Sequence, residues 1–578
     1  MTPPSAYDKN PTIPISTASA DCAVGWERVT ERLASGRPGT LCVECYPGVH
    51  LEEVERALRT ALAPRQVFRA GDCLKPAAEL NRLLSPILTE DPVFGRMNGL
   101  GIEDFMDPGK LTRARYVVSR CPGLTLVIGT GAALLAPQAD VLVYADLARW
   151  EIQQRQRRNE IPNLGVDNQR DLASVKYKRA YFVDWRAADR LKKRLLTRID
   201  YLLETSERQT PRLITGALFR RALAVTARRP FRLVPFFDPG PWGGEWMREV
   251  CALPAEAPNY AWCFDCVPEE NSLRLGFGTQ SVEIPAIDLV FFQPRELLGE
   301  AVHARFGTEF PIRFDFLDTM QGGNLSLQVH PLTEYIQDQF GMNYTQDESY
   351  YLLDAEADGG VYLGLREGID AEEMLAALER AGGGEGPFPV EEYVNRWPAK
   401  RHDHFLIPAG TIHCSARNSM VLEISATPYI FTFKLWDWDR LDLQGRPRPI
   451  HLQHGRENIQ WYRTTEWVRR NLINRVEACG QGEGWREERT GLHEREFIET
   501  RRHWFTGPVP HHTRGGVNVL NLVEGQEAVI ESPQAAFDPF VVHYAETFVV
   551  PAAVGPYTIR PARGGQHATI KAYVRTNP

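Results

Sequence analysis

The pattern of apolar residues changes near residue 230, and this change most strongly constrains how the chain can fold. Before it, strand-like apolar runs such as residues 40–45 (TLCVEC) and 124–129 (LTLVIG) alternate with charged helical runs. Strands that alternate with helices are typical of an α/β domain with a mainly parallel sheet. We therefore predict such a domain over residues 23–230. Residues 1–22, which contain several Pro, Ser and Thr, are predicted to form a disordered lead-in.

After residue 230 the apolar runs become short, rich in Val, Ile, Tyr and Phe, and separated by Gly and Pro. This spacing is typical of a β-sandwich or barrel. A helical insert over 369–397 interrupts it, and contains the pattern AEEMLAALERA. The chain is thus predicted to be multidomain, with one all-β domain over 231–368 and 398–465 and a second over 466–578.

The overall charge argues against nucleic-acid binding. The 578 residues include 66 Lys and Arg and 74 Asp and Glu, which gives a net charge of −8. Nucleic-acid binding needs a dense cationic surface. No run of about 18 apolar residues is present, so we expect no membrane contact. Ten scattered cysteines favour reduced thiols and a cytoplasmic location.

The first strand, its loop and the helix after it resemble the P-loop kinases of the uridine-kinase type, and Arg155, Arg157 and Arg158 are placed like the arginines of a kinase lid. The loop, Cys45 to His50 (CYPGVH), lacks the GxxxxGK[ST] pattern that holds phosphate and Mg²⁺. We predict a degenerate domain that transfers no phosphate. It offers a place for a nucleotide or protein partner, and the arginine run has a solvated helix face as its alternative role.

Four side chains in the β-rich region indicate a metal site. Gln328 and His330 are two residues apart in a predicted strand, so they point the same way. Glu348 begins a later strand, and His413 ends the turn PAGTIH. Two imidazoles, a carboxylate and an amide oxygen suit Zn²⁺ with one open position.

These motifs resemble the class I, cupin-type mannose-6-phosphate isomerases. The resemblance covers about 231–578 and rests on PWGG at 241–244, QVHP at 328–331, PAGTIH at 408–413 and FKLWDWDR at 433–440. It implies a double cupin, zinc as the cofactor and a sugar phosphate as substrate, interconverted between mannose 6-phosphate and fructose 6-phosphate. It implies that 466–578 is a second, metal-free half.

The substrate side departs from the family pattern. Gln346 replaces a lysine, and Lys434 replaces an arginine, so one charge and one planar fork are lost. The resemblance implies substrate binding by Gln346, Lys434 and Arg440. For the proton transfer, the catalytic candidates are Lys434, Glu423 and Asp437.

The residues leave other roles open. His404 is a further candidate for the general base, and its alternative is a solvated position beside a loop. Asp437 and Arg440 could pair with each other and hold a turn. The whole protein could be a catalytically impaired zinc cupin that binds carbohydrate or regulates. It could instead be a different metal-dependent cupin enzyme, because His, Glu and His also suit Fe²⁺ or Mn²⁺.

Overall fold

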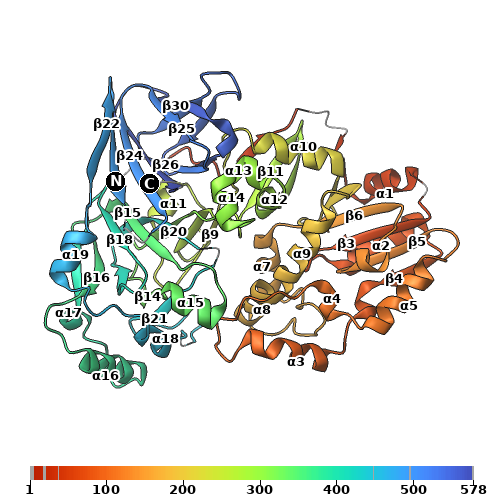
Figure 1. Cartoon of the computed structure of the whole chain (residues 1–578), viewed down its shortest axis with the longest axis horizontal. Helices are drawn as coiled ribbons and strands as arrows, with labels where there is room; N and C mark the ends of the chain where they lie inside the picture. Colours follow the sequence, from red (N-terminus) through yellow and green to blue (C-terminus); the bar gives the residue numbers. More distant parts are fainter. Residues whose placement is uncertain are drawn as a thin grey trace. The chain divides into compact units, whose positions relative to one another are not determined.

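The computed structural model describes residues 5–16, 21–36, 38–427, 429–446, 448–491, 493 and 496–575. The chain divides into two compact units (Figure 1). The α/β unit contains residues 12–226 and 272–292, and the β unit contains residues 1–11, 227–271 and 293–578. The chain is therefore multidomain, as predicted.

A seven-stranded sheet forms the centre of the α/β unit. Its strands, in spatial order, are β2 (Ala23–Val24), β8 (Arg212–Thr215), β7 (Tyr201–Glu204), β6 (Val141–Asp146), β3 (Thr40–Cys45), β5 (Thr125–Gly129) and β4 (Gln66–Arg69). The five strands from β7 to β4 run parallel, and β8 and β2 pair antiparallel at one edge. β3 is central and almost wholly buried, which explains its continuous apolar pattern.

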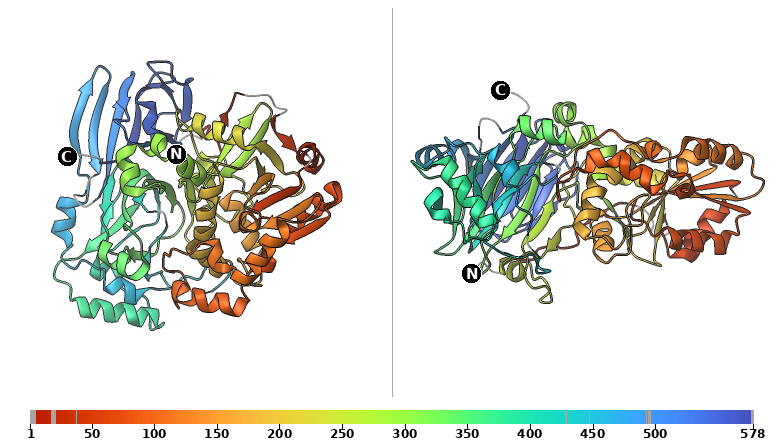
Figure 2. Two further views of the ribbon diagram at one scale, coloured as in Figure 1. Left: turned by 45° about the vertical axis from the view of Figure 1, so that its right-hand side comes forward. Right: turned by 90° about the horizontal axis from the view of Figure 1, so that it is seen from below.

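Helices lie on both sides of this sheet (Figure 2). They are α1 (Trp26–Ser35), α2 (Leu51–Leu62), η2 (Ala70–Cys73), α3 (Ala77–Leu88), α4 (Ile102–Phe105), α5 (Pro108–Val118), α6 (Ala132–Leu135), α7 (Arg149–Arg157), α8 (Ala173–Arg179), η3 (Ala180–Asp184), α9 (Trp185–Leu195) and α10 (Gly216–Thr226). α5 shows how local sequence sets a helix start: Asp107 accepts a hydrogen bond from the backbone N–H of Lys110, and Pro108 occupies the first turn.

Two findings differ from the predicted boundaries. Residues 272–292 form β11 (Ser272–Phe277), β12 (Gln280–Pro285) and α12 (Ile287–Phe292), and they belong to the α/β unit. β11 pairs with β12 and, in parallel, with β1 (Thr12–Pro14), inside the segment predicted as a disordered lead-in. Tyr7 is also buried, with its hydroxyl bonded to Asp265. Pairing with distant segments gives order that local composition did not indicate.

The β unit begins with two facing sheets. The six-stranded sheet contains β18 (His404–Ile407), β15 (Asp347–Ala355), β20 (Ser419–Ala426), β13 (Arg313–Asp318), β10 (Trp262–Cys266) and β9 (Phe236–Asp238). The five-stranded sheet contains β17 (Val394–Pro398), β16 (Gly360–Leu365), β19 (His413–Ser415), β14 (Leu327–Val329) and β21 (Phe433–Trp436). All pairs in both sheets are antiparallel, as in a sandwich or barrel.

Short helices decorate these sheets. They are α11 (Trp246–Val250), α13 (Pro294–Leu298), α14 (Glu300–Phe306), α15 (Thr333–Phe340), α16 (Ala371–Gly382), α17 (Val390–Tyr393), α18 (Leu452–Arg456) and α19 (Thr465–Asn471). α16 and α17 lie in the segment predicted as a helical insert. Asp370 caps α16 by accepting a hydrogen bond from the N–H of Glu373.

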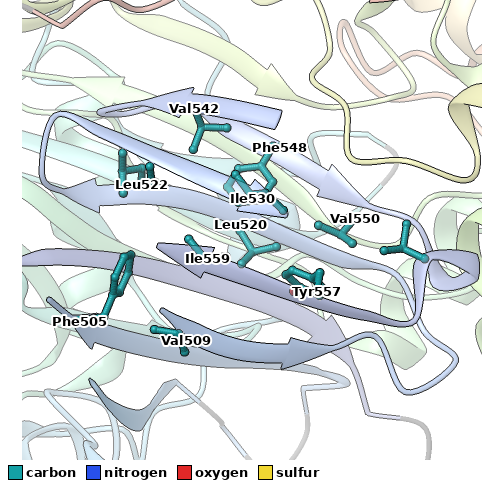
Figure 3. Packing of buried hydrophobic residues seen from close by; sticks show 12 residues of the cluster. Phe505, Val509, Leu520, Leu522, Ile530, Val542, Phe548, Val550, Tyr557 and Ile559 are labelled. Atoms are coloured by element: carbon teal, nitrogen blue, oxygen red, sulfur yellow. The ribbon is translucent and has the colours of Figure 1, made fainter. Parts of the chain in front are cut away.

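A second pair of sheets follows. One contains β22 (Glu477–Gly482), β23 (Trp485–Gly491), β24 (Ile498–Phe505), β31 (His567–Val574), β26 (Asn518–Glu524) and β29 (Thr547–Val550). The other contains β25 (Val509–His512), β30 (Pro556–Pro561), β27 (Glu527–Glu531) and β28 (Phe540–His543). Apolar side chains from both sheets, among them Leu520, Ile530 and Phe548, form the core between them (Figure 3).

Two further findings concern the chain as a whole. Among the described residues, no helix is both long and apolar enough to cross a membrane. All ten cysteines are free thiols, and eight of them are buried.

Candidate metal centre

The four predicted ligands come from three segments on two facing sheets. Gln328 lies in β14 and is paired in register with His413 of β19, and His330 follows directly after β14. Glu348 lies in β15, which belongs to the other sheet. All four side chains are buried. The structure thus brings them together inside the two-layered β domain.

The ligand atoms lie close to one another. The distance from His330 Nε2 to Glu348 Oε2 is 3.0 Å, and from His413 Nε2 to Glu348 Oε1 it is 2.9 Å. The amide nitrogen of Gln328 lies 3.1 Å from His413 Nε2. Turning this amide over would present its oxygen instead, because the two amide atoms exchange places by a simple rotation. Even without Gln328, the residues His330, Glu348 and His413 form a group that could hold a metal ion.

Backbone carbonyls fix the protonation of both histidines. His330 Nδ1 lies 2.8 Å from the carbonyl oxygen of Phe431, and His413 Nδ1 lies 2.8 Å from that of Thr411. A carbonyl oxygen only accepts, so in the neutral rings each Nδ1 carries the hydrogen and each Nε2 offers a lone pair. Two imidazole lone pairs therefore face the Glu348 carboxylate, an arrangement that a divalent cation would stabilise.

The charge of Glu348 fits this arrangement. Burial alone would raise the pKa of its carboxyl group, but the imidazoles of His330 and His413 together outweigh burial and hold this pKa well below its usual range. Glu348 is therefore ionised at neutral pH and available as a ligand. Its Oε1 has no hydrogen-bond partner, and neither has the Nε2 of His330. These residues fit a metal such as Zn²⁺.

Gln346 forms a hydrogen bond with the candidate ligand Glu348 and does not face an open substrate position. Its amide nitrogen donates to Glu348 Oε2 over 2.9 Å, and its amide oxygen accepts from the backbone N–H of Phe431 over 3.0 Å. Both ends of the amide are therefore in use. The side chain predicted to bind substrate is instead placed as a hydrogen-bond partner of the Glu348 carboxylate.

Glu423 faces the same interior as Glu348. It lies in β20, paired in register with Tyr350 of β15 and Asp315 of β13. Side chains alternate along a strand, so Tyr350 and Glu348 share a face, and Glu423 shares it with them. Burial raises the pKa of Glu423 well above its usual range, and the Asp315 and Glu348 carboxylates raise it further. Of the two predicted catalytic carboxyl groups, Glu423 and Asp437, it is Glu423 that the strand register places on the same face as the candidate ligand Glu348.

Lys434 and Asp437 belong to a cationic cluster at β21. Lys434 pairs in register with Gln328, and burial and the charge of Arg448 lower its pKa to about 8. Asp437 accepts hydrogen bonds from Arg440 over 2.7 Å and from Arg448 over 2.6 Å. Three cations against one carboxylate leave an excess of positive charge, which suits an anionic group.

Asp437 is therefore committed to ion pairs, consistent with the alternative in which it holds a turn with Arg440. Arg448 was not among the predicted site residues, although it ends the motif GRPR at 445–448.

His404, a further candidate for the general base, lies away from the metal centre. It pairs in register with Tyr351, one residue out of phase with Tyr350, so it faces away from the metal centre.

Three arginines of the α7 region, predicted to resemble those of a kinase lid, are engaged by other groups of the α/β unit. Arg155 is buried and donates to the carbonyl oxygens of Gly48 and Thr205 over 2.9 and 2.7 Å. Arg157 lies over the ring of Trp150. Arg158 pairs with Glu151 of α7 and with Glu160, which follows the helix. These three arginines are therefore engaged in contacts within the protein, which agrees with a structural role.

A cavity of about 520 Å³ lies at the carboxyl ends of β3 and β5. Tyr46, Gly48, Thr130 and Lys75 are among its lining residues. Ligands of open α/β sheets bind outside the carboxyl ends of the strands.

Comparisons with known proteins agree with a division of the chain. A family model described as Domain of unknown function (DUF8485) matches residues 25–228. Mannose-6-phosphate isomerase ManA of Bacillus subtilis (strain 168) is 27% identical over 237 residues, which is 40% of this chain and 68% of that protein. Mannose-6-phosphate isomerase of Streptococcus mutans serotype c is 26% identical over 214 residues, covering 37% of this chain and 62% of that protein.

Solved structures give a related finding. A crystal structure of the mannose 6-phosphate isomerase from Bacillus subtilis is 18% identical to this chain, with a TM-score of 0.49. It covers 60% of this chain and 100% of its own. The sequence similarities indicate a mannose-6-phosphate isomerase-like region covering about 40% of the chain, and they support an isomerase-like enzyme.

Proposed function

We propose that the protein is a zinc-dependent sugar-phosphate isomerase that interconverts mannose 6-phosphate and fructose 6-phosphate, or a closely related pair. The observation that carries this proposal is the meeting of His330, Glu348 and His413 with their lone pairs facing one another. The similarity to mannose-6-phosphate isomerases supports the same reading, as does the family's cupin arrangement of two facing antiparallel sheets.

Zn²⁺ at this site would act as a Lewis acid on the oxygens of an aldose or ketose. The chain's own residues would do the rest. Glu423, a buried carboxyl with a raised pKa, is the candidate for moving the proton between carbon atoms, because a raised pKa brings a carboxyl closer to neutral pH. Lys434, Arg440 and Arg448 would hold the phosphate group by charge-assisted hydrogen bonds.

A second candidate function follows from Gln346. Its amide is fully used by Glu348 and Phe431, so it provides neither the charge nor the mobility of a lysine. This favours a zinc-binding cupin that binds carbohydrate with little or no turnover. The two candidates share the metal centre and differ only in catalysis.

A coupled assay that converts mannose 6-phosphate to fructose 6-phosphate separates them. Turnover by the purified protein that disappears in Glu423→Gln supports the isomerase. An inert protein that gains turnover in Gln346→Lys supports the binding protein. Turnover unchanged by removal of the metal would contradict both.

For the α/β unit, we propose a degenerate P-loop-like domain. The spatial order β4, β5, β3, β6, β7 places the first parallel strand at the centre, as in the kinases that the sequence resembles. The cavity beside Tyr46 supports a site for a nucleotide or another small partner. We also propose zinc as the bound metal and a cytoplasmic location for the protein.

A further inference from the structure

A second polar cavity lies in the C-terminal pair of sheets of the β unit. Its volume is about 760 Å³. Charged and imidazole side chains from β23, β24, β25 and β31 line it, among them Glu487, Arg501, His503, His511 and Lys571. It contains none of the residues of the metal centre.

This cavity occupies one end of the space between the two sheets. Val509 and Phe505 belong to the apolar core shown in Figure 3. His511 is two residues after Val509, and His503 is two residues before Phe505, so each shares a face with its apolar neighbour. The interior is thus apolar at one end and polar at the other. Inward-facing polar groups cost free energy unless they have partners.

His511 is the clearest case of a group that lacks such a partner. Its side chain is 6% exposed, and neither ring nitrogen has a hydrogen-bond partner. Its ring stacks on Tyr557 with a centroid distance of 5.0 Å. Burial lowers the pKa of His511, so the ring is neutral and offers one donor and one acceptor. Buried polar groups normally have a hydrogen-bond partner, so a ligand that supplies one would be favoured here.

His503 adds an acceptor. Its Nε2 lies 3.1 Å from a carboxylate oxygen of Glu487, which accepts, so Nε2 carries the ring hydrogen. Its Nδ1 therefore offers a lone pair, and this atom has no hydrogen-bond partner. A ligand hydroxyl would satisfy it.

Cations exceed carboxylates along the cavity wall. Arg501, Arg514, Lys571 and Arg575 line it, against Glu487 and Glu499. Lys571 is 8% exposed, and its ammonium lies 4.0 Å from Glu487, beyond hydrogen-bond distance. Glu487 is meanwhile shared with Arg501 and His503. Lys571 thus keeps hydrogen-bonding capacity for an anion.

We propose that this cavity binds a small organic anion that also carries hydroxyl groups, such as a phosphorylated or carboxylated polyol. Lys571 contacts the anionic group. His503 Nδ1 accepts a hydrogen bond from one hydroxyl group of the ligand. The His511 ring forms a hydrogen bond with a second hydroxyl group. The proposal does not depend on the isomerase activity, because it rests on different residues.

Titration calorimetry on the full-length His413→Ala variant tests this proposal. The substitution weakens any binding at the metal centre. The probes are 6-phosphogluconate, inorganic phosphate and sorbitol. We expect 6-phosphogluconate to bind with a submillimolar Kd, and phosphate and sorbitol, which each offer half of the chemistry, to bind at least tenfold more weakly. Absence of 6-phosphogluconate binding would overturn the proposal.

Two variants place the binding in the cavity. Lys571→Met and His511→Phe should each weaken 6-phosphogluconate binding at least tenfold. Arg560→Met is the matched control, because Arg560 lies on β30, pairs with Glu531 and is absent from the cavity lining. Unchanged affinity in both test variants would overturn the proposal.

A crystal of the wild-type protein soaked in 6-phosphogluconate guards against variants that fold poorly. Electron density for the ligand beside His503 and Lys571 supports the proposal, and density only at other places contradicts it. His511→Phe should also keep its melting temperature, since the aromatic stacking on Tyr557 is retained, while losing the rise in melting temperature that the ligand gives the parent protein.

Discussion

Two backbone carbonyls decide which nitrogen of each ligand histidine can bind a metal. Those of Phe431 and Thr411 hold the Nδ1 hydrogens, and this aims both Nε2 lone pairs at Glu348. That Gln328 and His330 are candidate ligands on one face of a strand could be predicted from sequence. The carbonyls could not, because every residue has one and only the fold selects among them.

Arg448 should be needed for binding the phosphate group. Replacing it in Arg448→Met removes one charge-assisted hydrogen bond, worth about 1.5–3 kcal/mol, so the Kd for a sugar phosphate should rise roughly 10- to 100-fold. Calorimetry measures this, and metal content should stay unchanged. Arg446→Met is the control, because Arg446 belongs to the same motif but is exposed and pairs with Asp442. Equal effects of the two variants would argue against the phosphate role.

His404 should make the protein sensitive to acid. Burial lowers the pKa of His404 to about 3, whereas in the unfolded chain it is about 6.5. Between these values the unfolded chain binds the extra proton, so the free energy of unfolding falls as pH falls. His404 alone should account for roughly 2 kcal/mol between pH 7 and pH 5.

Urea unfolding at both pH values checks this, with His404→Phe expected to lose that part of the pH dependence. His303→Phe, on α14, serves as the control and should keep the wild-type slope. The interpretation fails if His404→Phe and the wild type respond identically to pH.

At the scale of elements, the turn between β18 and β19 positions His413, a candidate metal ligand. Gly410 has a φ of +85°, and a Cβ placed on it would lie 2.7 Å from the carbonyl oxygen of Asn458. The pattern PAGTIH indicated this turn from sequence alone. It did not indicate that Gln328 and His413 would be paired in register, because register between distant strands is set by the whole sheet.

Gly410→Ala should therefore damage both stability and metal binding. A left-handed backbone costs a non-glycine residue about 1–2 kcal/mol, and the clash adds to it. Gly368→Ala is the matched control: its φ is +77°, but nothing lies within 4 Å of the added Cβ. Urea unfolding and zinc titration should show that Gly368→Ala loses stability alone. Intact zinc affinity in Gly410→Ala would contradict the role of this turn.

At the scale of the whole molecule, the sequence change near residue 230 correctly indicated an α/β part and a β-rich part. It missed that residues 272–292 return to the α/β unit. There, buried Lys192 pairs with Asp146 over 2.7 Å and with Asp288 over 2.8 Å. The sequence contains these charged residues but does not indicate that they meet, since Asp146 lies 46 residues before Lys192 and Asp288 lies 96 residues after it.

The α/β unit should not turn over nucleotides. The loop at 45–50 has no Gly-Lys-Ser/Thr, and the Arg155 guanidinium is bound to the Gly48 carbonyl of this loop. We expect no release of phosphate from ATP or GTP with Mg²⁺ above the rate without protein. Hydrolysis that is lost in Arg155→Ala would show that the loop is active.

The metal content of the purified protein tests the central claim most directly. Elemental analysis of the wild type should find about one zinc ion per chain. It should find almost none in His413→Ala, while His303→Ala retains the wild-type amount. A wild type without bound metal after growth with zinc, or a His413→Ala protein that keeps its full complement, would contradict this account.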